Sequence, residues 1–296
     1  MTTNTAGRAS GQSATRTTSQ RQRLPFGRLL FHAFMILLGI SFFVPLAWIA
    51  STSFKSPGEV FITPIQWIPK TLRWDNFAEV FKRLPFAQFI LNSFYVAFMG
   101  TLGSVLSSTM VAFGLARIRW PGRDLVFTML VATLMLPFVV TLIPVFIIFK
   151  WMNWIGTFLP LWTPAWFGYA FYIFLMRQFM LTLPIELDEA ARIDGASNFR
   201  VLWQVIAPLC GPAIAPVAIF SFLHHYNDFL GPLIYVSSNE MFTLPLGLFW
   251  FQGRFGNFWH LVMAASMVTI APVILLFFVA QRYFVHGTQF SGLSGR

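Results

Sequence analysis

Six long stretches without a charged side chain most constrain how this chain can fold. Each has 25 residues or more, whereas the next longest charge-free stretches have 13. A bilayer core about 30 Å thick takes roughly 20 helical residues to cross. The sequence therefore predicts an all-α polytopic membrane protein with six transmembrane helices. The six windows are Leu29–Phe54, Leu84–Ala116, Leu125–Phe149, Trp151–Met176, Val201–Asn227 and Phe255–Gln281.

The composition excludes a water-soluble globule. Charged residues make up 10% of the chain, against about 25% in a typical soluble domain. The Lys and Arg residues also indicate an orientation. With a cytoplasmic N-terminus, 13 of the 20 fall in inside segments and 7 in outside segments. Because cytoplasmic loops carry the excess of Lys and Arg, we expect both termini in the cytoplasm. Outside the membrane segments the sequence has no basic face with interleaved aromatic residues, so it does not indicate a nucleic-acid partner.

Residues 1–28 are rich in Ser and Thr and contain arginine but no acid. We interpret them as a disordered basic cytoplasmic tail, with an organelle transit peptide as the alternative. The single cysteine, Cys210, excludes an intramolecular disulfide and a cysteine-based metal cluster. Within the second window, Gly100, Gly103, Ser104, Ser107 and Ser108 are expected to let neighbouring helix backbones approach closely.

The segment from Pro184 to Pro208 lies between the fourth and fifth spans and holds four of the ten acidic residues. Pro184 suits a first helical position, and acids are favoured in the first turns of a helix. Gly195 can end that helix in a left-handed conformation, and Ser197 can cap a second one. The sequence predicts two short helices that protrude from the membrane. The small pair Ala190 and Ala191 fits docking into a cleft on another protein; the alternative is a solvated acidic helix pair.

The stretch Glu189-Ala-Ala-Arg-Ile-Asp-Gly195 resembles the EAA loop of binding-protein-dependent ABC importer permeases. The family pattern continues with I-x-L-P, where this chain has Val-Ile-Ala-Pro208. Phe113–Asp124, Leu136–Pro144, Asn227–Phe229 and Gln281–Val285 look like the maltose-type branch, whose members import sugars and related solutes. The resemblance implies a type I importer permease fold over residues 29–296, with a cytoplasmic coupling loop at 184–208.

The resemblance also implies roles and partners. In this family the loop contacts the ATPase subunit, and the residues carried over to that contact are Glu189, Ala190, Ala191, Asp194, Gly195 and Pro208. The expected partners are a second permease, two ATPase subunits and an extracytoplasmic solute-binding protein, in a prokaryotic cell membrane. ATP hydrolysis is assigned to a partner, because no lysine in this chain follows a glycine as a Walker A loop requires. Neither catalytic residues nor a cofactor are expected.

Polar residues within the spans are the candidates for a solute path. Asn227 and Asp228 lie toward the outer end of the predicted fifth helix, and Tyr169 and Tyr172 lie in the fourth window. Polar groups at membrane depth usually face protein or a water-filled path. The alternative for Asn227 and Asp228 is a local role, in which polar side chains hydrogen-bond to one another or cap the helix end. For the neighbouring His224 and His225 we favour this local role.

Two other functional classes are weighed against the importer. A secondary transporter or channel would be expected to show ionisable relays within the spans or an inverted repeat, whereas the acids here cluster in loops. A membrane-embedded enzyme would need a catalytic constellation, and the five histidines form no metal-spacing motif such as H-E-x-x-H.

Overall fold

The computed structural model describes residues 25–291, and the part of the chain that it describes contains helices and no strand. The chain divides into two units, residues 1–47 and 48–296. Most of the tail predicted at residues 1–28 lies outside the described residues. The α-helices are α1 Pro25–Ser53, α2 Asp75–Arg83, α3 Phe86–Ala116, α4 Arg123–Ala132, α5 Phe138–Trp151, α6 Leu159–Trp162, α7 Ala170–Thr182, α8 Glu186–Ile193, α9 Asn198–Arg200, α10 Ala207–Leu209, α11 Gly211–Tyr226, α12 Leu230–Tyr235, α13 Leu244–Phe255 and α14 Trp259–Ser291. Short 3-10 turns are η1 Pro57–Glu59, η2 Thr133–Met135, η3 Thr163–Phe167 and η5 Asn239–Met241, and η4 Val201–Ile206 is a π-helix.

Within the described residues, three unbroken helices are long and apolar enough to cross a membrane, Gly27–Ser53, Phe86–Ala116 and Trp259–Gln281. Three further helix pairs pass the same test only together and are bent by 103°, 79° and 83°. Counting each bent pair as one span gives up to six spans, the number that the charge-free windows predict. The bent pairs are Arg123–Met135 with Phe138–Trp151, Leu159–Thr182 with Glu186–Ile193, and Asn198–Leu209 with Gly211–Tyr226.

The bend between α4 and α5 has a local cause in the sequence. Between α4 and α5, Leu136 is extended, with a ψ of 118°, because the following Pro137 disfavours the helical region for the residue before it. The fourth window, Trp151–Met176, does not form one continuous helix. It contains α6, η3 and α7, and Gly168 separates the last two at a φ of +100°. Gly adopts this conformation without the penalty that a Cβ would bring.

Helix α3 is the central element of the second unit and packs against α7 and α11. Gly100 and Gly103 of α3 allow a close approach, as predicted, but the groups that approach are aromatic rings. A Cβ on Gly100 would collide with the ring of His225, and one on Gly103 with the ring of Trp166. The Trp166 Nε1–H donates to the Met99 carbonyl at 3.1 Å, which fixes that ring against the helix.

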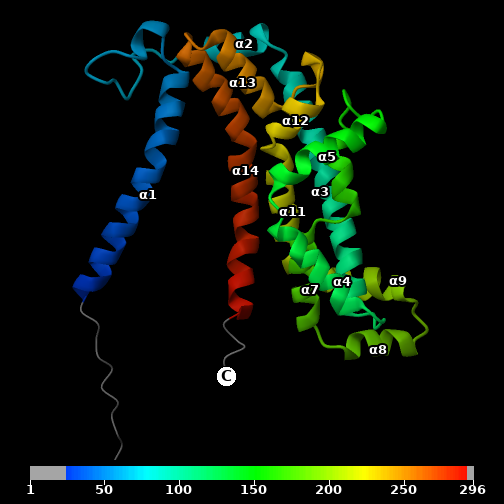
Figure 1. Cartoon of the computed structure of the whole chain (residues 1–296). Helices are drawn as coiled ribbons and strands as arrows, with labels where there is room; N and C mark the ends of the chain where they lie inside the picture. Colours follow the sequence, from blue (N-terminus) through cyan, green and yellow to red (C-terminus); the bar gives the residue numbers. More distant parts are fainter. Residues whose placement is uncertain (1–24, 292–296) are drawn as a thin grey trace, which may run out of the picture. The chain divides into compact units, whose positions relative to one another are not determined.

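Within this second unit the two ends of the bundle differ (Figure 1): α8 lies at one end, and α2, α12 and α13 lie at the other. At the α2 end, buried Asn92 of α3 donates to the carbonyls of Glu240 and Phe242 at 2.8 and 2.9 Å. The Ser93 hydroxyl accepts from the Leu244 N–H at 2.7 Å. These bonds satisfy backbone groups of the segment that leads into α13.

Candidate functional site

The segment predicted as two short helices contains α8, α9 and the π-helix η4, at one end of the bundle (Figure 1). Helix α8 begins at Glu186, with Ile185 as the residue before it, so the predicted start at Pro184 is two residues too early. The first turns carry Glu186, Asp188 and Glu189, where carboxylates interact favourably with the helix dipole.

The turn after α8 forms as its residue types predict. Asp194 ends the helix, and Gly195 follows at a φ of +82°. The Ala196 N–H then bonds to the Ala191 carbonyl at 2.9 Å, which closes the turn. Ser197 caps α9 by accepting from the Arg200 N–H at 3.4 Å. No atom lies within 4 Å of a Cβ built on Gly195, so the backbone conformation alone restricts this position.

The two alanines do not share one environment. Ala190 is exposed together with Glu189, whereas Ala191 is half-buried against an apolar cluster that includes Met180, Leu183 and Leu202. Of the two small residues predicted to form a docking face, only Ala190 is therefore exposed. Ala191 instead helps to seat α8 on the bundle.

Two large apolar side chains are open on this segment. Ile193 is 87% exposed and Phe199 is 68% exposed. Leu202 and Ile206, which follow Phe199 along the same segment, are buried, whereas Phe199 is not. Sequence reasoning missed Ile193 because an isoleucine in the last turn of a short helix is read as part of the core. Both side chains are open to a contact and each stands next to an arginine in the sequence, Arg192 and Arg200.

Arg117, at the end of α3, connects the bundle to this segment and was not predicted. Its Nη2 donates to the carbonyls of Met180 and Leu183 at 2.6 and 2.8 Å. Its Nη1 lies 3.0 Å from Oδ2 of Asp188, and both side chains are almost fully buried. One guanidinium thus holds the end of α7 and the first turn of α8 together.

Burial raises the pKa of the Asp188 carboxyl, and the positive charge of Arg117 acts in the opposite direction. Neither Asp188 oxygen has a hydrogen-bond partner among the described residues, so the ion pair is what compensates the buried charge. Removing one partner of a buried ion pair is strongly destabilising. The pair therefore makes α8 a rigid attachment.

A second arginine joins the same end of the bundle to the turn between α3 and α4. Arg177 of α7 donates from Nε to the Leu115 carbonyl at 3.2 Å. Its Nη2 lies 3.6 Å from Asp124, and its guanidinium lies 3.9 Å above the ring of Phe127. Helices α3, α4 and α7 are thereby linked near the base of α8.

A hollow of about 360 Å³ lies between α8 and the residues that follow α3. Glu189 lines it together with Arg119 and Arg192. Of the predicted loop residues, the structure places Glu189 here, Asp194 and Gly195 at the turn, and Pro208 in α10 beyond η4. Pro208 is exposed and belongs to the bend that leads into α11.

The solute-path candidates fall into two groups. The rings of Tyr169 and Tyr172 lie 5.0 Å apart, and Tyr169 also meets His224 of α11 at 5.8 Å between centroids. Tyr169 and His224 are exposed, whereas Tyr172 is buried. His225 has a local partner, since its Nδ1 lies 2.8 Å from the Ser221 carbonyl oxygen. The His224 ring meets that of His225 at 5.2 Å between centroids as well as that of Tyr169, and the sequence did not reveal the contact with Tyr169.

Asn227 is exposed and follows the last residue of α11. The neighbouring Asp228 is half-buried, and its Oδ1 accepts from the Gly231 N–H at 3.0 Å in the first turn of α12. A Cβ on Gly231 would collide with that carboxylate. Asp228 thus has a local role at a helix start, while the amide of Asn227 stays accessible. Among the described residues, no group of three or more His, Cys, Asp or Glu side chains could hold a metal ion.

The chain is similar to curated permeases over most of its length. It is 34% identical over 270 residues to the arabinooligosaccharides transport system permease protein AraQ of Halalkalibacterium halodurans, covering 90% of this chain and 96% of that protein. It is 34% identical over 269 residues to the sn-glycerol-3-phosphate transport system permease protein UgpE of Escherichia coli O1:K1, covering 87% of this chain and 95% of the relative.

The fold also matches solved structures. A chain of a bacterial ABC transporter involved in the import of the acidic polysaccharide alginate superposes with a TM-score of 0.78 at 22% identity, covering 88% of this chain and 99% of that one. A bacterial alginate ABC transporter in complex with an alginate pentasaccharide-bound periplasmic protein gives a TM-score of 0.61 at 15% identity, with 86% and 94% covered. These likenesses show the fold.

The model of the family described as binding-protein-dependent transport system inner membrane component matches residues 103–289, a range that contains α8, the turn at Gly195 and α11. The membership predicted from the loop is confirmed, as is the predicted all-α membrane fold. The chain belongs to this family of inner membrane components and is a permease subunit of an ABC importer.

Proposed function

We propose that this permease forms half of a path for a sugar or sugar-like solute, and that α8 with α9 couples the path to a separate ATPase. The observation that carries the coupling is the combination of Ile193 and Phe199 open on the surface with the buried Arg117–Asp188 pair behind them. A surface meant to transmit force needs an exposed contact area and a rigid base. This segment has both.

The coupling proceeds through two connections. When the ATPase subunits close on nucleotide, they displace α8. Arg117 transmits that displacement to α3, and η4 with α10 transmits it to α11. Packed helices tend to switch between discrete arrangements, so the displacement changes which side of the membrane the path faces. Glu189 supplies a polar contact to the ATPase beside the apolar one.

The solute class is proposed from the relatives and from the path residues. The two relatives' names refer to arabinooligosaccharides and to sn-glycerol-3-phosphate, which share hydroxyl-rich carbon chains. Tyr169 and His224 offer ring faces and polar tips, and Asn227 offers an amide. Aromatic rings beside hydrogen-bonding groups suit a hydroxylated solute, because the rings cover C–H faces while the polar tips bond to hydroxyls.

The proposed assembly contains this chain, a second permease, two ATPase subunits and an extracytoplasmic solute-binding protein. One matched structure includes a periplasmic protein with bound alginate pentasaccharide, which supports an external receptor. Both termini and α8 are proposed to face the cytoplasm, because the Lys and Arg distribution favours that side.

The experiment that tests this function is reconstitution of the complete complex in proteoliposomes with the purified solute-binding protein. Uptake of a radiolabelled sugar ligand of that receptor should require ATP on the α8 side and should stop with a non-hydrolysable analogue. The control contains both permeases without the ATPase. Uptake in that control, driven by a solute or ion gradient, would instead identify a secondary transporter or channel.

A further inference from the structure

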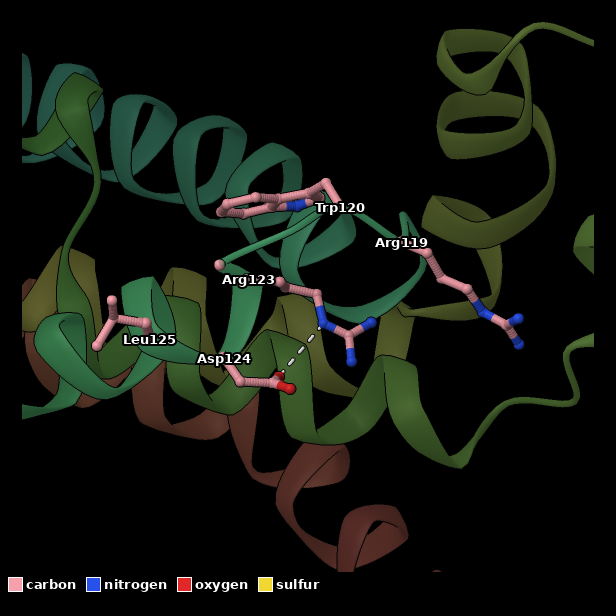
Figure 2. Close-up of a pocket in the computed structure, with 6 residues that line it drawn as sticks. Arg119, Trp120, Arg123, Asp124 and Leu125 are labelled. Carbon is pink, nitrogen blue, oxygen red and sulfur yellow. Dashed lines mark hydrogen bonds and ion pairs between the residues drawn. The ribbon is translucent and has the colours of Figure 1, made fainter.

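A second hollow lies on the turn between α3 and α4, next to the coupling segment. Its volume is about 300 Å³, and it is lined by Arg119, Trp120, Gly122, Arg123, Asp124 and Leu125. Figure 2 shows the side chains of Arg119 and Arg123 extending to the same side of the turn, with Leu125 on the other side. Two cations therefore line one side of the hollow and an apolar side chain the other, at the start of α4.

The charge in this hollow favours an anion. Asp124 is already shared between Arg123 at 3.3 Å and Arg177 at 3.6 Å. Within the described part of the chain, the exposed Arg119 guanidinium forms no ion pair with an acid. One carboxylate against three guanidinium groups leaves a positive balance, and Arg119 is free to bind. Paired arginines present a planar array of N–H donors that matches a phosphate group.

An apolar groove is lined from the same helix start. It has a volume of about 410 Å³ and is lined from α3, α4 and α7, including Val111, Val126, Met129, Leu130 and Ile173. Val126 directly follows Leu125 of the basic hollow, so both depressions are lined from the first turn of α4. With a rise of 1.5 Å per residue, α4 carries the groove roughly 10 Å away from the arginines.

Trp120 marks the depth of this site in the membrane. Its ring is 39% exposed, and its Nε1–H donates to the Gly114 carbonyl at 3.1 Å. Tryptophan is enriched at the level of lipid headgroups. The arginines thus lie at the membrane interface, and the groove runs from there into the span formed by α4 and α5.

We propose that this site binds an anionic phospholipid, with the phosphate on Arg119 and Arg123 and one acyl chain in the groove. Basic pockets between transmembrane helices are known to take anionic headgroups, and here a basic and an apolar depression are both lined from the first turn of α4, as one lipid with a headgroup and a chain requires. The occupied site would hold α4 against α3 and α7 beside the base of α8. The inference does not depend on which solute is transported.

Native mass spectrometry of the complex in detergent tests the proposal. The full chain with its partner subunits is incubated with phosphatidylglycerol or phosphatidylcholine of identical acyl chains. The wild type should retain phosphatidylglycerol in preference. Arg119→Gln combined with Arg123→Gln should lower that preference by about fivefold for each arginine removed. Arg200→Gln, which removes another exposed arginine at the same end, is the matched control and should keep it.

Two further measurements separate the headgroup from the chain. Ala170→Phe narrows the groove and should reduce retention of long-chain phosphatidylglycerol more than of its short-chain form. Inorganic phosphate at equal concentration should not displace the lipid. If the arginine variants fold poorly, rising salt with the wild type should selectively release phosphatidylglycerol, because salt screens exposed charges.

Three results would overturn the lipid site. The double variant could retain phosphatidylglycerol as the wild type does. Inorganic phosphate could displace the lipid completely, which would indicate a site for a free anion. The double variant could lose the ATPase subunits on purification with its lipid unchanged, which would assign the arginines to a protein contact.

Discussion

At the scale of single residues, the coupling segment depends on one glycine and one arginine. Gly195 has a φ of +82° and no neighbour that a side chain would strike. A β-branched residue in this region is an outlier, and the left-handed region costs an ordinary L-residue about 1 to 2 kcal/mol.

We therefore expect Gly195→Val to uncouple transport, with ATP-dependent uptake in membrane vesicles falling well below that of the wild type. Gly195→Asn is the matched control, because asparagine tolerates the left-handed region, and it should retain most of the uptake. Equal uptake by the two variants would show that the backbone conformation at this turn has no part in coupling.

Arg117→Met should destabilise the protein by about 3 to 5 kcal/mol, because it leaves the Asp188 carboxylate buried without its partner. The loss should grow as the pH rises. Without Arg117, the pKa of Asp188 lies further above its unfolded value of about 3.9, so the folded state binds the extra proton at low pH and loses that advantage as the pH passes through the folded pKa.

Thermal unfolding of Arg117→Met in detergent between about pH 5 and about pH 8 measures this dependence. The double variant Arg117→Met with Asp188→Leu carries no buried charge at the pair and should regain much of the stability, with a flatter pH profile. A destabilisation of Arg117→Met that does not change with pH would mean that Asp188 is not the group responsible.

At the scale of elements, α8 presents Ile193 as its most exposed apolar side chain, at 87%. Ile193→Asp should reduce co-purification of the ATPase subunits, because the carboxylate would be desolvated in an apolar contact. Ile68→Asp is a close control, since Ile68 is 83% exposed in the segment before α2, and it should leave that association unchanged. Loss of the ATPase in both variants would indicate a general defect in assembly.

The contact between α3 and η3 depends on Gly103, where a Cβ would collide with the ring of Trp166. Gly103→Ala should lower the free energy of unfolding by about 1 to 3 kcal/mol through overpacking. Gly114→Ala lies in the same helix with nothing within 4 Å of the new Cβ, and should be neutral or stabilising because alanine favours a helix. The melting temperatures of the two variants are measured side by side. Equal values would contradict the packing of Trp166 against Gly103.

At the scale of the whole molecule, the proposed path and the proposed coupling segment occupy different parts of one fold. Tyr169, His224 and Asn227 lie near the ends of α7 and α11, whereas α8 is joined to other ends of the same bundle through Arg117 and η4. A change in the path should therefore affect solute choice without breaking the complex.

Asn227→Ala should change the relative uptake of different sugars while receptor-stimulated ATP hydrolysis by the complex is kept. Competition between labelled and unlabelled sugars in proteoliposomes gives the preference directly. An Asn227→Ala complex with the solute preference of the wild type would remove this residue from the path.

The number of apolar spans, the turn at Gly195 and the cap at Ser197 could be predicted from the sequence, because each depends on composition or on residues within a few positions. The packing of the helices was needed to show that Arg117 pairs with Asp188, that Ala191 is packed while Ile193 and Phe199 are open, and that His225 and Trp166 fill the spaces at Gly100 and Gly103. Those contacts join residues far apart along the chain. Local propensity acts only over a turn or two of helix, so which distant side chains meet depends on how whole helices pack.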